Sequence, residues 1–169
     1  MARRQTPAVA SSAQLLLVCS TGGHLLQLLA LRPVWDDRSR VWVTFDKSDA
    51  RSLLAGEDVV RAAGPTNWTF GLRALANHLR NLRLALAVVR RVRPAVVLTT
   101  GAGLAVPFVW IARAHGARVV YVESLTRVEG PSLGCRLIRP VADRLYVQWP
   151  ELARVLPGSR YAGNVFQRR

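Results

Sequence analysis

The sequence predicts an α/β fold built on a Rossmann-like, doubly wound parallel sheet. Short apolar runs alternate with helical patterns along the chain, glycine-rich turns follow two of these runs, and 50% of the 169 residues are hydrophobic. A chain of this length can bury a substantial core in one domain. We expect residues 1–13 to form a flexible N-terminal end and residues 14–169 to form a single domain, because no repeat or internal linker interrupts the pattern.

The first half of the chain predicts three strands and two helices. Leu15–Val18 is an uninterrupted apolar run of the kind buried in parallel sheets, and leucines at helical spacing follow it. Val41–Phe45 is rich in β-branched and aromatic residues and predicts the second strand. Ser48 or Asp49 can cap a short helix after it, and residues 58–61 predict a third strand.

The second half predicts one long helix, three further strands and two shorter helices. Leucines spaced by three and four predict a helix over residues 70–93. Strands are expected at 96–99, 118–122 and 145–147, and the shorter helices at 101–115 and 133–139. If the strand order is 3-2-1-4-5, the first and fourth strands flank the point where the winding of the sheet reverses. Ligands bind at that point in such folds.

The turn after the first strand, Ser20-Thr21-Gly22-Gly23-His24, predicts an anion site. Its glycines allow the backbone to turn tightly, and His24 lies on the first turn of the following helix. A helix N-terminus offers free backbone N–H groups and a partial positive charge, which suit a phosphate. The alternative is a strand–helix turn that binds no ligand.

A second glycine loop, Thr99-Thr100-Gly101-Ala102-Gly103, follows the fourth strand, and Glu123 follows the fifth. Because parallel strands end at one edge of a sheet, both loops and the acid are expected to face one crevice. We expect neither His24 nor Glu123 in the core, since each follows the exposed end of a strand. The alternatives are that the two threonines only cap the next helix and that Glu123 pairs with Arg127.

Several common site motifs are absent from the sequence. It has no G-x-G-x-x-G dinucleotide fingerprint and no P-loop, and Asp46 fits a surface turn better than a ribose ligand. Cys19 and Cys135 have no metal-ligand spacing, so we expect free thiols in a reducing compartment and no metal. A self-contained nucleotide-cofactor enzyme stays open as an alternative function.

The formal net charge of +14 implies an anionic partner, which is a phosphate compound, a nucleic acid or an acidic membrane surface. The predicted helix at 70–93 carries six arginines and no acid. We expect its leucines to pack on the sheet, and Arg73, Arg80 and Arg91 to meet anionic headgroups. The alternative is a solvated basic face. We expect no nucleic acid, because the arginines lack interleaved aromatic residues.

Four segments resemble the Alg14/PssD/CpsF family: Ser20–His24, Thr99–Pro107, Tyr121–Val128 and Ala142–Pro150. This family is the partner-recruiting half of a split GT-B glycosyltransferase and is similar to the N-terminal domain of MurG. The resemblance implies the N-terminal half of a GT-B fold. It also implies that a separate subunit binds the UDP-sugar, which is of the UDP-N-acetylglucosamine type. This chain would then bind the acceptor, a polyprenyl-diphosphate-linked sugar, without a cofactor, and it would be inactive alone.

The same resemblance implies roles for individual residues. His24 and Glu123 match a histidine and a carboxylate near the acceptor, either of which orients or deprotonates its hydroxyl. The first 14 residues cannot span a bilayer, unlike the membrane helix of the eukaryotic members, so we expect a bacterial, peripheral protein on the cytoplasmic face of the plasma membrane, serving capsule or exopolysaccharide assembly. The residues that suit the acceptor diphosphate are Ser20, Thr21, Gly22, Gly23, Thr100, Gly101 and Gly103.

Overall fold

The computed structural model describes residues 15–64 and 72–167, with side chains from residue 75 onward in the second range. The expected flexible end at 1–13 and the first two residues of the long predicted helix lie outside these ranges. In chain order the elements are β1 (Leu15–Val18), α1 (Gly23–Ala30), α2 (Arg32–Trp35), β2 (Arg40–Phe45), α3 (Ser48–Leu53), β3 (Val59–Ala62), α4 (Leu72–Val92), β4 (Val96–Thr99), α5 (Ala105–Ala114), β5 (Arg118–Val122), α6 (Leu133–Ile138), the 3₁₀ turn η1 (Arg139–Val141), β6 (Arg144–Val147), α7 (Pro150–Val155) and β7 (Ser159–Tyr161).

The strands form one seven-stranded sheet in the order β3-β2-β1-β4-β5-β6-β7, with every neighbouring pair parallel. This confirms the doubly wound fold and the expected central order. β1 and β4 pair side by side, with Val18 opposite Thr99, so the two glycine loops leave the sheet next to each other. The winding reverses between these strands.

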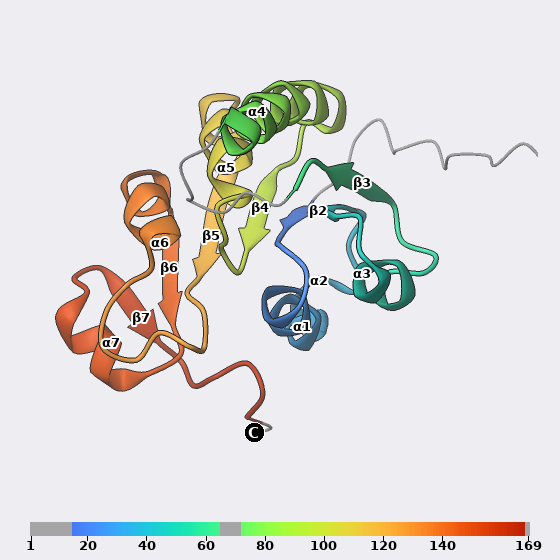
Figure 1. Ribbon diagram of the computed structural model, residues 1–169. Coiled ribbons are helices and arrows are strands. Elements are labelled where there is room, and N and C mark those ends of the chain that lie inside the picture. The colour runs from blue at the N-terminus through green and yellow to red at the C-terminus, as the bar shows by residue number, and fades with distance from the viewer. Residues whose placement is uncertain (1–14, 65–71, 168–169) are drawn as a thin grey trace, which may run out of the picture.

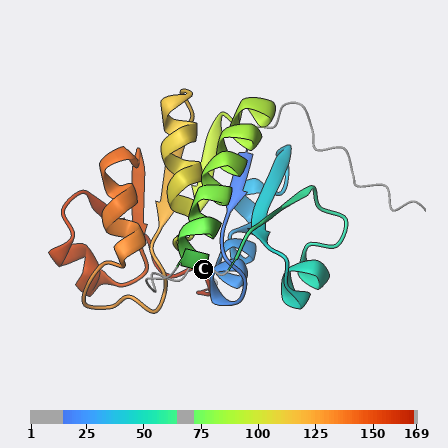
Figure 2. The ribbon, with the colours of Figure 1, turned by 45° about the horizontal axis from the view of Figure 1, so that its top comes forward.

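Helices cover both faces of the sheet (Figures 1 and 2). The pleat sends alternate residues of β1 to opposite sides, which creates two core clusters. Leu16 and Val18 pack with residues of α4, α5 and α6. Leu15 and Leu17 pack with residues of α1, α2 and α3. The apolar run at 15–18 is therefore buried on both faces, as its composition predicts.

Four elements were missed from the sequence, namely α2, the 3₁₀ turn η1, α7 and β7. β7 is Ser-Arg-Tyr and has no apolar pattern, and α2 is a single turn of four residues. α7 carries start signals that were available, since Pro150 opens it and Glu151 lies in its first turn.

The face of α4 that packs on the sheet is not the predicted one. Leu75, Leu79 and Leu82 are 58%, 52% and 47% exposed. The buried positions of the helix are Asn77, Asn81, Ala85, Val88, Val89 and Val92. The expectation that the leucine stripe packs on the sheet is therefore wrong for these three residues, which lie on the outside of the molecule.

Asn81 accounts for this rotation of α4. Its side chain is 1% exposed, its Oδ1 accepts the N–H of Ala63 at 2.9 Å, and its Nδ2 donates to the Ala63 carbonyl at 2.7 Å. A buried amide satisfied at both ends stabilises this pairing by about 1 kcal/mol per hydrogen bond. The small residue Ala85, one turn later, lets the helix lie close to the sheet. A leucine count alone cannot reveal such a polar anchor.

Candidate functional site

The first glycine loop begins α1 and is already in contact with a carboxylate. Gly22 has φ +72°, a conformation that favours glycine, and its N–H donates to Oδ2 of Asp49 at 2.7 Å. Asp49 lies in the first turn of α3, where Lys47 is the N-cap and no side chain caps the helix. The expectation that Ser48 or Asp49 caps this helix is therefore wrong. Asp49 instead accepts a hydrogen bond from one of the N–H groups that were predicted to face a phosphate.

In the second glycine loop, the backbone N–H of Gly101 is used inside the loop itself. The N–H of Gly101 donates to Oγ1 of Thr99 at 2.9 Å, and Gly101 has φ +98°. A Cβ at this position would lie 2.7 Å from the hydroxyl of Tyr121, so space and conformation both require glycine. Helix α5 starts at Ala105 without a side-chain cap. The alternative that the two threonines cap this helix is therefore not what the structure has.

His24 and Thr100 join the two loops through a pair of hydrogen bonds. Nδ1 of His24 lies 2.7 Å from the Thr100 carbonyl oxygen, and the Thr100 hydroxyl donates to the His24 carbonyl at 2.8 Å. A carbonyl only accepts, so Nδ1 carries the proton and Nε2 of the neutral ring is left as the acceptor. Burial lowers the pKa of the imidazole below 6.5, and the Thr100 hydrogen bond opposes this less strongly. His24 is therefore a neutral base at pH 7.

Glu123 lies in the core, which corrects the expectation that it is exposed. Its side chain is 0% exposed, and its carboxylate accepts the N–H of Ser124 and the N–H of Ser132, each at 2.8 Å. The Ser132 hydroxyl donates to it as well, at 3.0 Å. Glu123 continues the alternation of β5 and therefore points to the same side as Tyr121. Within the described residues it forms no ion pair with Arg127.

These elements enclose an open pocket of about 320 Å³ at the C-terminal edge of the sheet. Three of the predicted residues line it, namely Ser20, His24 and Gly103. The loop after β5 and the start of α6 add lining residues that were missed as ligands, and these are Ser124, Thr126, Arg127, Ser132 and Leu133. The available signal was a segment rich in hydroxyls with one arginine, directly after a strand.

The other predicted residues lie around this pocket. Thr100 is buried behind His24, Gly101 is buried, and Thr21 lines a neighbouring hollow with Asp46 and Lys47. Gly22 and Gly23 are exposed at the start of α1, with open space where a Cβ would be. The structure therefore brings His24 together with Ser20 and Gly103, two of the residues predicted to bind the diphosphate. Glu123 is buried and does not line the pocket.

A buried amide network, also missed from the sequence, holds the loop after β5. Oε1 of Gln27 accepts the N–H of Leu125 at 2.8 Å and Nε2 of Gln148 at 2.6 Å. The same Nε2 donates to the Glu123 carbonyl at 2.9 Å, and Oε1 of Gln148 accepts the N–H of Val165 at 3.0 Å. One side of the pocket is thereby tied to α1 and to the C-terminal segment.

The structure gives no sign of a metal centre or a membrane span in the residues it describes. No group of three or more His, Cys, Asp and Glu side chains in residues 15–64 and 72–167 is arranged to hold a metal ion. Over the same residues, no helix combines the length and apolarity needed to cross a bilayer. Cys19 and Cys135 are buried free thiols, as expected.

Two solved structures share this fold. MurG from Acinetobacter baumannii superposes with a TM-score of 0.70 at 16% identity, over 91% of this chain and 46% of the MurG chain. A UDP-N-acetylglucosamine 2-epimerase from Rickettsia bellii gives a TM-score of 0.63 at 14% identity, over 89% of this chain and 44% of the epimerase. This chain therefore spans less than half the length of either protein and corresponds to one half of a GT-B-type fold.

Sequence comparisons give the family. The UDP-N-acetylglucosamine transferase subunit ALG14 of Mus musculus is 27% identical over 91% of this chain and 83% of its own length. The same subunit of Eremothecium gossypii is 38% identical over 66% of this chain and 51% of its own. The family model for oligosaccharide biosynthesis protein Alg14-like matches residues 69–165, which is more than half of the chain and includes β4, β5 and the pocket loop. The chain therefore belongs to the family of Alg14-like oligosaccharide biosynthesis proteins.

Proposed function

We propose that this protein is the acceptor-binding subunit of a UDP-N-acetylglucosamine glycosyltransferase, and that it recruits a separate donor-binding subunit. The observation that carries the proposal is the pocket beside His24, where a neutral imidazole held by Thr100 faces a hydroxyl-rich loop with one arginine. The acceptor is a sugar linked to a polyprenyl diphosphate, and the product extends a lipid-linked oligosaccharide or polysaccharide precursor.

His24 acts as the general base in this proposal. Its Nε2 accepts the proton of the acceptor hydroxyl as that oxygen attacks the anomeric carbon of the donor sugar and the UDP group leaves. A neutral base with a fixed tautomer suits this step because the proton acceptor is present at pH 7. Glu123 has a positioning role, because its carboxylate is already satisfied by Ser124 and Ser132.

The acceptor diphosphate binds between the start of α1 and the loop after β5. The positive end of α1 and the exposed backbone of Gly22 and Gly23 lie on one side of this space. Arg127 lines the pocket on the other side and takes part in no ion pair within the described residues. A guanidinium free to bind two oxygens suits a diphosphate.

The donor-binding subunit covers the C-terminal edge of the sheet. Three large apolar side chains are exposed at this edge: Leu26 on the first turn of α1, Val128 after β5 and Leu133 at the start of α6, at 49%, 38% and 47%. Exposed apolar residues around a polar pocket are typical of a surface that another protein covers. A single half of a GT-B-type fold also leaves the donor side of such a cleft open.

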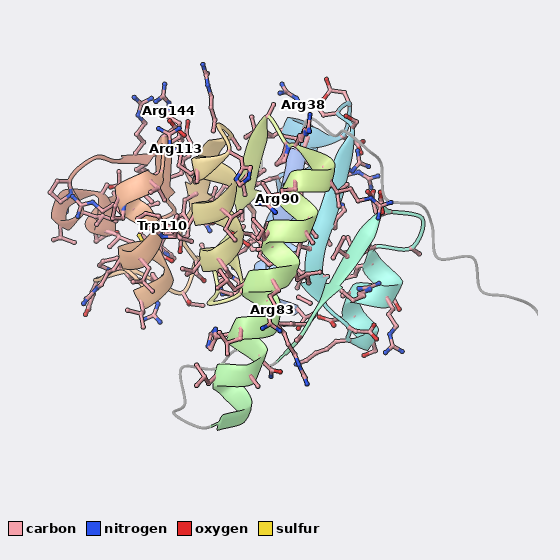
Figure 3. All side chains as sticks on the ribbon, turned by 90° about the horizontal axis from the view of Figure 1, so that it is seen from above. Arg38, Arg83, Arg90, Trp110, Arg113 and Arg144 are labelled. Carbon is pink, nitrogen blue, oxygen red and sulfur yellow. The ribbon has the colours of Figure 1, made fainter. Side chains whose placement is uncertain are left out.

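A membrane surface lies against α4 and α5. Leu75, Leu79 and Leu82 are exposed along α4, and Figure 3 shows Arg83 and Arg90 on the same outer face as Trp110 of α5. Leucines beside arginines suit the boundary of an anionic bilayer. These features support a peripheral position of the proposed bacterial protein on the cytoplasmic face of the plasma membrane, together with the proposed lipid-linked acceptor. Arg80 and Arg91 lie on another line of α4 and contribute less in this arrangement. The side chain of Arg73, the third predicted arginine, lies outside the part of the chain that the structure describes.

Titration calorimetry with soluble short-chain ligands tests the acceptor assignment. The chain alone is expected to bind a short-prenyl diphosphate-linked N-acetylglucosamine and to bind UDP-N-acetylglucosamine at least about tenfold more weakly, since the donor belongs to the partner. Arg127→Gln should weaken acceptor binding by about 1.5–3 kcal/mol, the contribution of a charge-assisted hydrogen bond. Arg118→Gln, at the exposed start of β5 and therefore at the opposite edge of the sheet, is the matched control. Tighter binding of UDP-N-acetylglucosamine would contradict the assignment.

A further inference from the structure

A second pocket lies far from the one beside His24. It has a volume of about 500 Å³ and sits between the C-terminal ends of α4 and α5. It lies at the edge where the parallel strands begin, because α4 leads directly into β4, whereas His24 follows the end of β1. Its lining residues are Val89, Arg90, Arg93, Pro94, Ala112 and His115.

The charges lining this pocket are all of one sign. Two arginines, Arg90 and Arg93, line it together with His115, and its lining includes no Asp or Glu. In residues 15–64 and 75–167, neither arginine belongs to an ion pair. Nδ1 of His115 is held by the Ile111 carbonyl at 2.8 Å, which leaves Nε2 available to a ligand. The lining is therefore suited to an anion.

Arg93 has a backbone conformation that is usually found at glycine. Its φ is +47°, its N–H donates to the Val89 carbonyl at 2.9 Å just beyond the end of α4, and Pro94 follows. A residue in this left-handed conformation after a helix is usually glycine and sometimes asparagine, because a Cβ is disfavoured there. An arginine at this position therefore costs stability, and Arg93 is one of the residues that line the pocket.

The pocket continues the exposed leucine line of α4. Leu79, Leu82, Leu86, Arg90 and Arg93 follow one another by three or four residues, so they lie along one side of the helix. Leu79 and Leu82 are exposed at the apolar end of this line, and the pocket lies at its cationic end. A lipid surface contacted by the leucines would therefore bring its phosphates to Arg90 and Arg93.

We infer that this pocket binds the phosphate of an anionic phospholipid headgroup. The inference rests on the proposed membrane face and adds to it a specific site with a preferred headgroup. Arg93 and Arg90 contact the phosphate oxygens, and His115 lines the pocket beside them. A phosphomonoester such as that of phosphatidic acid offers more oxygens and charge than a phosphodiester, so it binds best.

The test compares Arg93→Asn with Arg154→Asn. Asparagine tolerates the left-handed conformation, so Arg93→Asn should keep the fold. Arg154 is an exposed arginine on α7, beside β6 and β7 at one end of the sheet and away from α4, and gives the same change in net charge (Figure 1). Binding is measured by co-sedimentation with phosphatidylcholine vesicles that contain either phosphatidic acid or phosphatidylserine at equal surface charge.

We expect Arg93→Asn to weaken binding to the phosphatidic acid vesicles by about tenfold or more, and Arg154→Asn by no more than about twofold. Equal losses in the two variants, or no preference for phosphatidic acid in the wild type, would overturn the site. Binding of glycerol 3-phosphate that matches the vesicle affinity would show a site for free phosphate and would also overturn it. Arg90→Gln repeats the test if Arg93→Asn has a changed circular dichroism spectrum.

A further variant separates this site from the membrane face on which it rests. Leu79→Ser combined with Leu82→Ser removes the apolar contact and should weaken binding to both vesicle types alike. If that variant binds as the wild type while Arg93→Asn loses the phosphatidic acid preference, the headgroup site stands and the leucine face fails. If the double leucine variant loses binding while Arg93→Asn keeps the preference for phosphatidic acid, the membrane face stands and the headgroup site is overturned.

Discussion

His24 and Thr100, 76 residues apart, hold each other by two hydrogen bonds of 2.7 and 2.8 Å. The bonds join the helix after β1 to the loop after β4 across the point where the sheet reverses. They also leave Nε2 of His24 as the free side of the ring. These two hydrogen bonds therefore fix the position of His24 in the pocket and select one tautomer of its imidazole. Neither effect can be read from the sequence motif.

The variant His24→Asn separates these two effects. Asparagine can donate its amide hydrogen to the Thr100 carbonyl as Nδ1 does, but it has no atom in the place of Nε2. We expect kcat of the assembled enzyme to fall by about 10²–10⁴, the usual contribution of a general base, with the donor KM nearly unchanged. Steady-state kinetics with one substrate varied at a time gives both constants. A normal kcat would show that His24 is only a structural link.

His24→Asn also removes a pH dependence. The folded-state pKa of His24 lies below the ordinary 6.5, so the folded state binds its proton less readily than the unfolded state does. The stabilising contribution is therefore present above pH 6.5 and is lost as the pH falls through the folded-state pKa. The fall in stability of the wild type below pH 6.5 should be steeper than that of the variant.

Asp49→Asn tests where the acceptor diphosphate lies. Asp49 accepts the Gly22 N–H at the start of α1, and its negative charge opposes a second anion there. Asparagine keeps an acceptor oxygen and removes the charge. We expect the acceptor KM to fall roughly fivefold, which corresponds to about 1 kcal/mol of repulsion between solvated charges. The matched control is Asp37→Asn, whose side chain is 82% exposed in another loop. An unchanged KM would place the diphosphate away from Gly22.

Glu123→Gln should lower stability and not only activity. The carboxylate accepts two backbone N–H groups and the Ser132 hydroxyl in the core, and a glutamine amide turns one of its donors toward them. An unsatisfied buried donor costs about 1–3 kcal/mol. Urea unfolding measures the loss, with Glu129→Gln, in the exposed part of the same loop, as control. Equal stability of the two variants would show that Glu123 does not organise the loop.

The alternation of apolar runs and glycine turns was enough to predict the sheet and its central order, because buried parallel strands leave a clear apolar pattern. The two glycine loops and His24 were also placed correctly at one edge. Glu123 was expected outside the core because the sequence does not show that Ser132, nine residues on, folds back to satisfy it. The orientation of α4 was missed for a similar reason, since Asn81 and Ala63 meet only in the folded chain.

The exposed leucines of α4 give a test of that correction. Leu75→Ser and Leu82→Ser should each change the free energy of unfolding by less than about 0.5 kcal/mol, as surface substitutions do. If the leucines packed on the sheet, each loss would be about 2–5 kcal/mol. Ala85, on the buried side of the same helix, is the matched contrast, and Ala85→Ser should destabilise more than either. Thermal or urea unfolding decides between these outcomes.

Sugar transfer by the purified chain, with and without a donor-binding subunit, tests the central claim most directly. The assay supplies UDP-N-acetylglucosamine and a polyprenyl diphosphate-linked N-acetylglucosamine and measures formation of the disaccharide lipid. Because one half of a GT-B-type cleft lacks the donor site, we expect no turnover by the chain alone and turnover when the second subunit is added. Robust transfer by the chain alone would contradict the assignment of this protein as the acceptor half of a two-subunit enzyme.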